Sequence, residues 1–232
     1  MSADLTMHTG NFSFLVPHAY PGRLVVAEGL DGSGKSTQLQ LLRFWLRSEG
    51  YETVLTKWNS SKLIKQILKA GKKRGYMDPA LLSILHAADL AELYQCDIVP
   101  ALKRGAIVLA DRYVYAALAR DLARGVERDW TQQVYQFAAR PDLVIYFHLS
   151  AEQSLERTLS EHLRVKYYQA GMDLRLSSDP IDSFRAFQQC ILDAYETMIN
   201  GSALLRLDAT LPVQQQQRLL RTAVELLLPH EG

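Results

Sequence analysis

Residues 23–37 read RLVVAEGLDGSGKST, and this stretch decides the fold. Within it, positions 29–36 match the phosphate-binding loop pattern G-x-x-x-x-G-K-[ST] at every fixed position. The apolar run at 24–27 predicts a strand before the loop, and a helical pattern follows it. The sequence therefore predicts a nucleoside-triphosphate site between a buried strand and a helix.

The residue types of this loop indicate how it would hold ATP and Mg²⁺. Glycines let the backbone wrap closely around a polyphosphate and point its N–H groups at the oxygens. The Lys35 side chain can reach the β- and γ-phosphates, and the Ser36 hydroxyl can bind Mg²⁺ at the start of the helix. We expect the ATP contacts to come from Gly29, Leu30, Asp31, Gly32, Ser33, Gly34, Lys35, Ser36 and Thr37.

Bulk composition argues against several classes of function. Lys and Arg number 26 and Asp and Glu 25, so a general basic surface for long nucleic acid is not expected. No apolar run approaches the length of a membrane span, and residues 1–22 lack the pattern of a secretion signal. We therefore expect a cytoplasmic protein with no membrane partner. Cys96 and Cys190 are expected to be reduced thiols in the core.

The order of apolar segments predicts one α/β domain. Strand-like runs lie at 24–28, 53–57, 106–111, 143–149 and 203–207. The helical patterns between them cover 60–71, 80–103, 114–124, 131–139, 151–163, 181–199 and 212–228. This alternation is typical of βαβ units around a buried parallel sheet. We expect an N-terminal arm at 1–22, the domain at 23–232, and a polar lid at about 164–180.

A second informative stretch is IVLADRY at 107–113, where an apolar strand ends in a carboxylate and a guanidinium. Ligands of a parallel sheet lie beyond the carboxyl ends of its strands, so Asp111 should point towards the phosphates of the loop. Asp111 could then hold Mg²⁺ directly or through water, and Arg112 could clamp a phosphate. The alternative is a structural ion pair between these two residues at the strand end.

With these motifs the chain resembles thymidylate kinases and their wider nucleoside-monophosphate-kinase relatives. The resemblance covers roughly residues 23–210 and is carried by EGLDGSGKST at 28–37, IVPALKRG at 98–105, DRY at 111–113 and RPDL at 140–143. It implies a three-layer P-loop kinase fold, in which helices flank a five-stranded parallel sheet and a lid closes over ATP. By analogy it also implies a homodimer, for which the helices at 80–103 and 114–124 could supply an apolar face.

The resemblance also implies roles for individual residues. Asp31 would contact the sugar hydroxyl of the phosphate acceptor and Arg112 its phosphate, while Lys35 and Ser36 would contact ATP and Mg²⁺. Phosphoryl transfer needs cations along the equatorial oxygens. Some relatives place an arginine inside the loop, where this chain has Gly32 and Ser33. A cation from the lid is therefore expected, with Arg164 or Lys166 preferred over Arg157.

Three departures from the family pattern bear on the acceptor. An Arg-Glu-Pro-like segment is replaced by TKWNS at 56–60, where Lys57 could bind a phosphate as a point charge without the arginine fork. The third helix carries LHAADL at 85–90, with no arginine to read a base. Ala116 and Arg120 stand where the family tends to have a serine and an aromatic residue. The substrate-binding residues are therefore expected among Asp31, Lys57, His86, Asp89, Arg112, Ala116 and Arg120.

These features favour an Mg²⁺–ATP-dependent kinase acting on a small nucleotide, with dTMP as the first-choice acceptor. A kinase for another nucleotide or for a phosphorylated metabolite is the first alternative. The second is a nucleotide-dependent ATPase or switch module. A GTPase switch would carry an Asn-Lys-x-Asp element, but Asn11, Asn59 and Asn200 are followed by Phe, Ser and Gly.

Overall fold

The computed structural model describes residues 14–73, 77–199 and 204–228. A parallel sheet in the order β3-β4-β2-β6-β7 lies at its centre. Its strands are β2 (Arg23–Gly29), β3 (Thr53–Lys57), β4 (Ile107–Asp111), β6 (Leu143–His148) and β7 (Leu204–Asp208). The predicted α/β fold with a five-stranded parallel sheet is confirmed.

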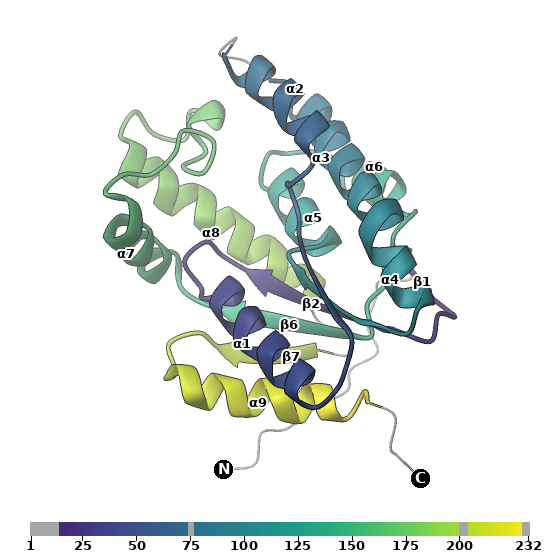
Figure 1. The fold of residues 1–232 in the computed structure, drawn as a ribbon. Helices are drawn as coiled ribbons and strands as arrows, with labels where there is room; N and C mark the ends of the chain where they lie inside the picture. Colours follow the sequence, from purple (N-terminus) through teal and green to yellow (C-terminus); the bar gives the residue numbers. More distant parts are fainter. Residues whose placement is uncertain (1–13, 74–76, 200–203, 229–232) are drawn as a thin grey trace.

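Helices cover both faces of the sheet (Figure 1). They are α1 (Lys35–Ser48), α2 (Lys62–Lys73), α3 (Pro79–Leu93), α4 (Val99–Lys103), α5 (Val114–Leu122), α6 (Arg128–Tyr135), α7 (Ala151–His162), α8 (Pro180–Ile199) and α9 (Val213–Glu225). Leucines of α1 and α9 pack with Val25 and Ile145 on one face. Aromatic and aliphatic side chains of α3, α5 and α8 pack with Val26 and Val144 on the other. These two apolar layers make up the main core, and smaller buried clusters lie between α2 and α3 and between α7 and α8.

The register of the strands brings two loops together. Strand β2 is central and pairs with β4 so that Ala27 lies opposite Asp111. On its other side, Gly29 lies opposite Phe147 of β6. Because all these strands are parallel, the segments that follow β2 and β4 leave from the same edge of the sheet. The phosphate-binding loop follows β2 and the Asp-Arg-Tyr motif lies at the end of β4, so both lie at this edge, as the sequence predicted.

Several helix ends differ from the sequence pattern by one to four residues, and two of the differences have a clear physical reason. The helix expected at 80–103 is divided into α3, a π-helical turn at Tyr94–Ile98 and α4. Pro100 has no N–H group, so it cannot continue the α-helical hydrogen bonds there. Helix α6 begins before residue 131, because the Glu127 side chain accepts hydrogen bonds from the N–H groups of Asp129 and Trp130.

Residues 14–22 of the expected N-terminal arm pack on the domain. Strand β1 (Val16–Pro17) pairs in parallel with β5 (Ala139–Arg140), and Leu15 beside it is buried. Asp142 accepts hydrogen bonds from His18 (3.0 Å) and from the N–H of Leu24 (2.7 Å). Residues 1–13 lie outside the described residues, and the arm boundary at residue 22 stays a prediction.

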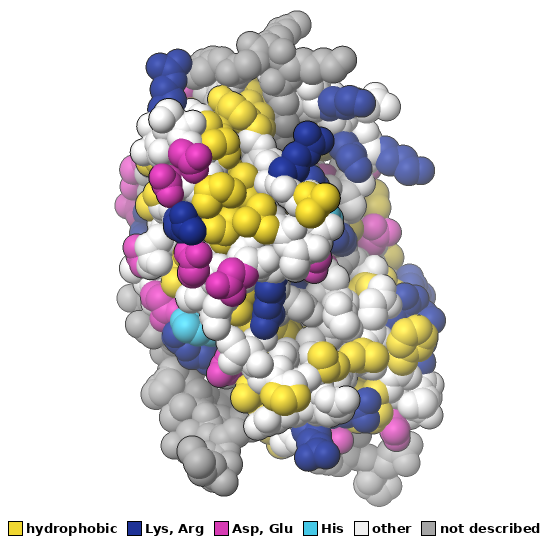
Figure 2. Space-filling model, turned by 90° about the vertical axis from the view of Figure 1, so that its left-hand side faces the viewer, with side chains coloured by type: hydrophobic (Ala, Val, Ile, Leu, Met, Phe, Trp, Pro, Cys, Tyr) yellow, Lys and Arg dark blue, Asp and Glu magenta, His cyan; other side chains and the backbone are white. Residues whose placement is uncertain are grey.

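The surface, one face of which is drawn in Figure 2, qualifies two expectations from the sequence. Cys96 and Cys190 are free thiols but both are exposed, so their predicted place in the core was wrong. The apolar residues of α5 at 114–119 are buried within the chain, so this helix offers little face to a second copy. Helix α3 exposes Leu81 and Ile84, and a homodimer stays a prediction. Within the described ranges, no helix is both long and apolar enough to cross a membrane.

Candidate active site

The phosphate-binding loop connects β2 to α1, and two of its glycines are required by geometry. Gly29 has a φ of +133°, and a Cβ there would lie 2.4 Å from the carbonyl oxygen of Phe147. Gly34, with a φ of +84°, directly precedes α1. Positive φ values are easily adopted by glycine and strained for other residues. The first N–H groups of α1 have no side-chain cap, and such a helix start suits an anion.

The neighbouring helix α7 is fastened to the backbone of this loop. The Ser154 hydroxyl donates to the carbonyl oxygen of Asp31 at 2.7 Å. One turn later, Arg157 donates to the carbonyl oxygens of Gly32 (3.1 Å) and Ala209 (3.0 Å). Arg157 was a third candidate for the lid cation, and the structure instead places its guanidinium on backbone carbonyls.

The Lys35 ammonium group lies inside the loop. It is buried and donates to the carbonyl oxygen of Leu30 (2.6 Å) and to the Ser33 hydroxyl (2.8 Å). Burial, assisted by the positive charge of Arg112, lowers the pKa of Lys35 to about 7. Both hydrogen-bond partners are neutral oxygens, so neither holds the charge on Lys35, and a phosphate in the loop would favour the charged ammonium.

The two predicted magnesium ligands lie in direct contact. The Ser36 hydroxyl donates to the Asp111 carboxylate, which is itself buried. The Lys57 ammonium lies 3.9 Å from the same carboxylate on a largely exposed side chain. In the part of the chain that the structure describes, no group of three or more His, Cys, Asp or Glu residues could hold a metal. One hydroxyl and one carboxylate fit Mg²⁺, which usually takes few protein ligands beside water and substrate phosphates.

Two adjoining hollows open at this edge of the sheet. The smaller, of about 300 Å³, lies over the phosphate-binding loop, and the larger has a volume of about 740 Å³. The larger hollow, called the acceptor cavity below, is lined by Asp31, Gly32, Lys57, Trp58, Asn59, Leu82, His86, Arg112, Arg120, Arg124, Thr158, Glu161, His162, Lys166, Tyr167, Tyr168 and Gln169. Asp31, Gly32, Lys57, Arg112 and Glu161 line both. A molecule in one hollow can therefore meet a molecule in the other.

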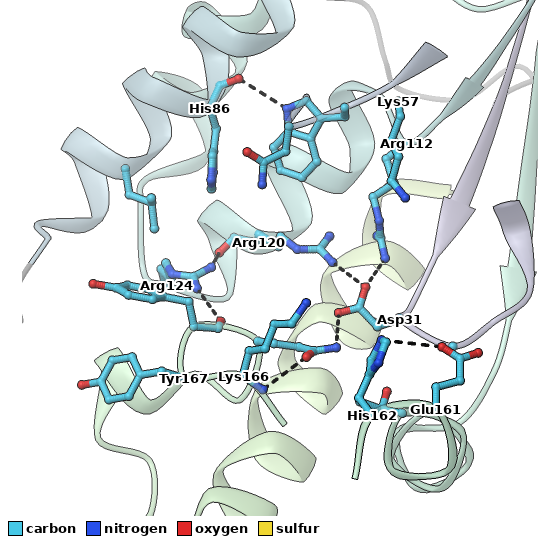
Figure 3. A pocket seen from close by; sticks show the side chains of 17 residues that line it. Asp31, Lys57, His86, Arg112, Arg120, Arg124, Glu161, His162, Lys166 and Tyr167 are labelled. Atoms are coloured by element: carbon cyan, nitrogen blue, oxygen red, sulfur yellow. Dashed lines mark hydrogen bonds and ion pairs between the residues drawn. The ribbon is translucent and has the colours of Figure 1, made fainter. Parts of the chain in front are cut away.

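Asp31 is the meeting point of the polar side chains in the acceptor cavity (Figure 3). Its Oδ1 accepts hydrogen bonds from Arg112 and, at 3.4 Å, from Arg120, while its Oδ2 accepts from Gln169 at 3.0 Å. Burial alone would raise the pKa of Asp31, but Arg112 and Arg120 outweigh it and hold the pKa well below its usual range. Asp31 is therefore an ionised hydrogen-bond acceptor.

Arg112 is held in an unusual backbone conformation. Its φ is +72°, its N–H donates to the carbonyl oxygen of Ala27 (3.0 Å), and its guanidinium donates to that of Gly29 (2.8 Å). The next residue, Tyr113, donates its N–H to the buried carboxyl group of Glu28 at 2.8 Å. Such left-handed residues persist when their surroundings determine them strongly, and they gather at functional sites.

The far wall of the acceptor cavity is aromatic. The Trp58 indole donates to the carbonyl oxygen of His86 (3.4 Å), and the two rings meet edge to face at 5.0 Å. The Arg120 guanidinium lies 5.8 Å from the centre of the Trp58 ring. The Trp58 and His86 side chains are nearly buried, and the aromatic part that lines the cavity beside a guanidinium suits the ring system of a nucleotide base.

Two expected substrate residues lie away from this wall. Asp89 is buried, and its carboxylate accepts hydrogen bonds from the N–H groups of Asn59 (2.6 Å) and Ser61 (2.8 Å). It therefore holds the backbone beside the cavity without lining it. Ala116 is fully buried in the core and does not line the cavity either.

The segment expected to be a lid, 164–180, carries Lys166 into the acceptor cavity, whereas Arg164 is not among the lining residues. It is tied to the domain by an ion pair between Asp173 and Arg124 at 3.0 Å. Gln188 of α8 also donates to the carbonyl oxygen of Gln169 at 3.0 Å. The sequence pattern did not single out Gln169 or Arg124 for a role, because each acts through a contact with a distant part of the chain.

Comparisons with known proteins agree with this geometry. The family described as Thymidylate kinase matches residues 27–219. "Probable thymidylate kinase 2" of Saccharolobus solfataricus is 36% identical over 198 residues, which cover 84% of this chain and 92% of the relative. "Thymidylate kinase" of Clavibacter michiganensis is 31% identical over 89% of this chain and 96% of its own length. "Probable thymidylate kinase" of Pyrococcus horikoshii is 44% identical over 59% of this chain and 69% of its own length. With its fold, its loop and this match over most of its length, the chain belongs to the thymidylate kinase family.

Proposed function

We propose that this protein transfers the terminal phosphate of ATP to dTMP and so forms dTDP. The observation that carries the proposal is the junction of the two hollows at Asp31 and Arg112. A phosphate donor on the loop and an acceptor in the larger cavity would meet there. The relatives named above as thymidylate kinases support dTMP as the acceptor. They disfavour a switch module or a kinase for an unrelated metabolite.

On the donor side, the loop from Gly29 to Thr37 would hold ATP through its backbone N–H groups and the Lys35 ammonium. Ser36 and Asp111 would hold Mg²⁺, which neutralises charge on the phosphates when it is bound. Lys166 is our preferred lid cation for the transferred group, because it lines the acceptor cavity while Arg164 does not. These residues act by positioning and by charge, which is what phosphoryl transfer demands of a protein.

On the acceptor side, Arg112 would hold the phosphate of dTMP and Asp31 would accept a hydrogen bond from its sugar hydroxyl. Trp58 and His86 would flank the base, and Lys57 lines both hollows. Asp89 would contribute by fixing the backbone of Asn59. The cytoplasmic location and the homodimer remain predictions from the sequence and the family.

The decisive experiment is an ADP-release assay with dTMP, dCMP, dGMP and dAMP, each with and without Mg²⁺. We expect dTMP to be the fastest acceptor and Mg²⁺ to be required. Lys35→Ala should lower turnover at least about 100-fold, because it removes a charge contact in the transition state. Release of ADP that no monophosphate accelerates would overturn the kinase assignment, and equal rates with all four would overturn the thymine assignment.

A further inference from the structure

In the acceptor cavity, two nearly buried arginines share the carboxylate of Asp31. The Arg112 and Arg120 side chains are 12% and 14% exposed, and both donate to the same oxygen of Asp31. They come from different elements, because Arg112 follows β4 and Arg120 lies on α5. In Figure 3 they reach Asp31 from two sides of the cavity.

The charges around this oxygen do not cancel. Two guanidinium groups and one carboxylate leave one positive charge, and the third partner, Gln169, is neutral. Arg124, a third cation of the cavity, adds nothing to this excess, because its charge is balanced by Asp173. Buried charges require partners of opposite sign. The excess therefore favours an anion between the two arginines.

Arg120 is held in place for such a contact. Its Nη1 donates to the carbonyl oxygen of Ala116 one turn earlier at 3.3 Å, and its guanidinium lies against Trp58. Lys57, which the sequence offered as the second phosphate cation, has a side chain that is 70% exposed. An anchored guanidinium presents several donors in a fixed geometry, whereas an exposed ammonium is a mobile point charge.

We propose that Arg120 is a second ligand for the phosphate of the acceptor. The phosphate binds between Arg112 and Arg120 and takes over their donors from Asp31. The Asp31 carboxylate is then able to accept the hydrogen bond from the acceptor's sugar hydroxyl. This inference rests on the proposed function, since it assigns a residue to the phosphate of the same monophosphate.

The test removes the phosphate from the ligand and the guanidinium from the protein separately. Calorimetry measures the affinities of dTMP and of thymidine, which lacks the phosphate, for the native protein, Arg120→Gln and Arg120→Lys. We expect Arg120→Gln to weaken dTMP about 10- to 100-fold, as for loss of a charge-assisted hydrogen bond, and thymidine less than about 3-fold. Arg120→Lys should recover part of the dTMP affinity.

A matched control removes the same charge from the surface. Arg104 is exposed and pairs with Glu52, so Arg104→Gln should leave both affinities unchanged. Thermal unfolding confirms that Arg120→Gln is folded, which we expect because Asp31 keeps Arg112 and Gln169 as partners. Equal weakening of dTMP and thymidine would place Arg120 on the nucleoside and overturn the proposal. Unchanged dTMP affinity would overturn it as well.

Failure of the proposed function is recognised separately. If the native protein binds another monophosphate in place of dTMP, the thymidylate assignment falls. Arg120 is then tested with that monophosphate and its own nucleoside in the same way. If the native protein binds no monophosphate, both proposals fall.

Discussion

The phosphate-binding loop and the acceptor cavity are built in different ways. The loop is one continuous run, residues 29–37, and it would hold a phosphate largely through backbone N–H groups and one lysine. The acceptor cavity is assembled from separate segments, including Trp58 after β3, His86 on α3, Arg120 on α5 and Gln169 before α8. A backbone site survives most side-chain changes and keeps its motif. A side-chain site can be rebuilt residue by residue.

The largest expected effect breaks the backbone site. Gly29→Ala places a Cβ 2.4 Å from a carbonyl oxygen and forces a φ of +133° on alanine. We expect it to lower the free energy of unfolding by about 4 kcal/mol and to abolish ATP binding. Gly50→Ala is the matched control, because Gly50 also has a positive φ but a Cβ there meets nothing within 4 Å. It should cost about 1 kcal/mol and leave ATP binding intact. Equal effects would contradict the close contact at Gly29.

The second test concerns Glu28, a buried residue of β2 that directly precedes the loop and bonds to Tyr113 after β4. Burial raises its pKa to about 7 from an ordinary value of 4.5, so the folded protein holds the proton more tightly than the unfolded chain. The resulting stabilisation, about 3 kcal/mol, is complete below pH 4.5 and is lost as the pH rises to 7. Glu28→Gln cannot ionise and should remove this decline when urea unfolding is measured at pH 5 and pH 8.

The carboxyl of Glu28 has a partner for either protonation state, since Oε2 lies 2.9 Å from the Tyr195 hydroxyl. A glutamine fits the same partners, with its oxygen towards the Tyr113 N–H and its amide towards Tyr195. Glu49→Gln, on an exposed residue, should leave the slope unchanged. An identical decline in Glu28→Gln and in the native protein would show that another group causes it.

The third test asks whether the acceptor wall is separable from the loop. Trp58→Ala removes the ring beside Arg120 and His86, so the KM for dTMP should rise about 10- to 30-fold. The KM for ATP should change less than about 2-fold, because Trp58 does not line the smaller hollow. Trp45→Ala removes a tryptophan that packs against Arg221 on the far side of the sheet, and it should affect neither KM. A similar rise in both KM values for Trp58→Ala would show that the loop and the acceptor cavity do not bind their nucleotides independently.

The smallest effect is expected at Asp89. Asp89→Asn keeps one acceptor oxygen and loses the other, so one of the bonds to Asn59 and Ser61 is broken. The KM for dTMP should rise about 3- to 5-fold, as for one buried hydrogen bond. Asp78→Asn is the control, because Asp78 caps α3 through one oxygen and asparagine caps equally well. No change in KM would mean that the backbone of Asn59 does not depend on Asp89.

Much of the fold could be predicted from the sequence because its signals are local. The strands follow from apolar runs such as 107–111, and the loop follows from spacing that glycine geometry demands. Pro100 lacks an N–H group, and this alone indicates a break in the helix near that position. The extent of the π-helical turn cannot be predicted in this way, because it depends on packing.

The acceptor cavity could be predicted only in part. His86, Arg120 and Lys166 lie in it, whereas Asp89 and Ala116 face the core or the backbone. Whether a helical residue faces the cavity or the core depends on how the helix packs. In α3 the apolar residues are spread around the whole helix, so their periodicity gives little indication of the buried face. Gln169 reaches Asp31 across 138 positions of sequence, and no local pattern encodes such a contact.

The two hydrogen bonds from α7 to the loop fix the orientation of two peptide planes in the loop. In a trans peptide the N–H points away from the preceding C=O, and the described residues contain no cis bond. Ser154 and Arg157 draw the carbonyl groups of Asp31 and Gly32 towards α7. The N–H groups of Gly32 and Ser33, at the other ends of those planes, are thereby turned towards the opposite side. A peptide flip in the loop would have to break a hydrogen bond to a helix first, so the loop is oriented before any phosphate arrives.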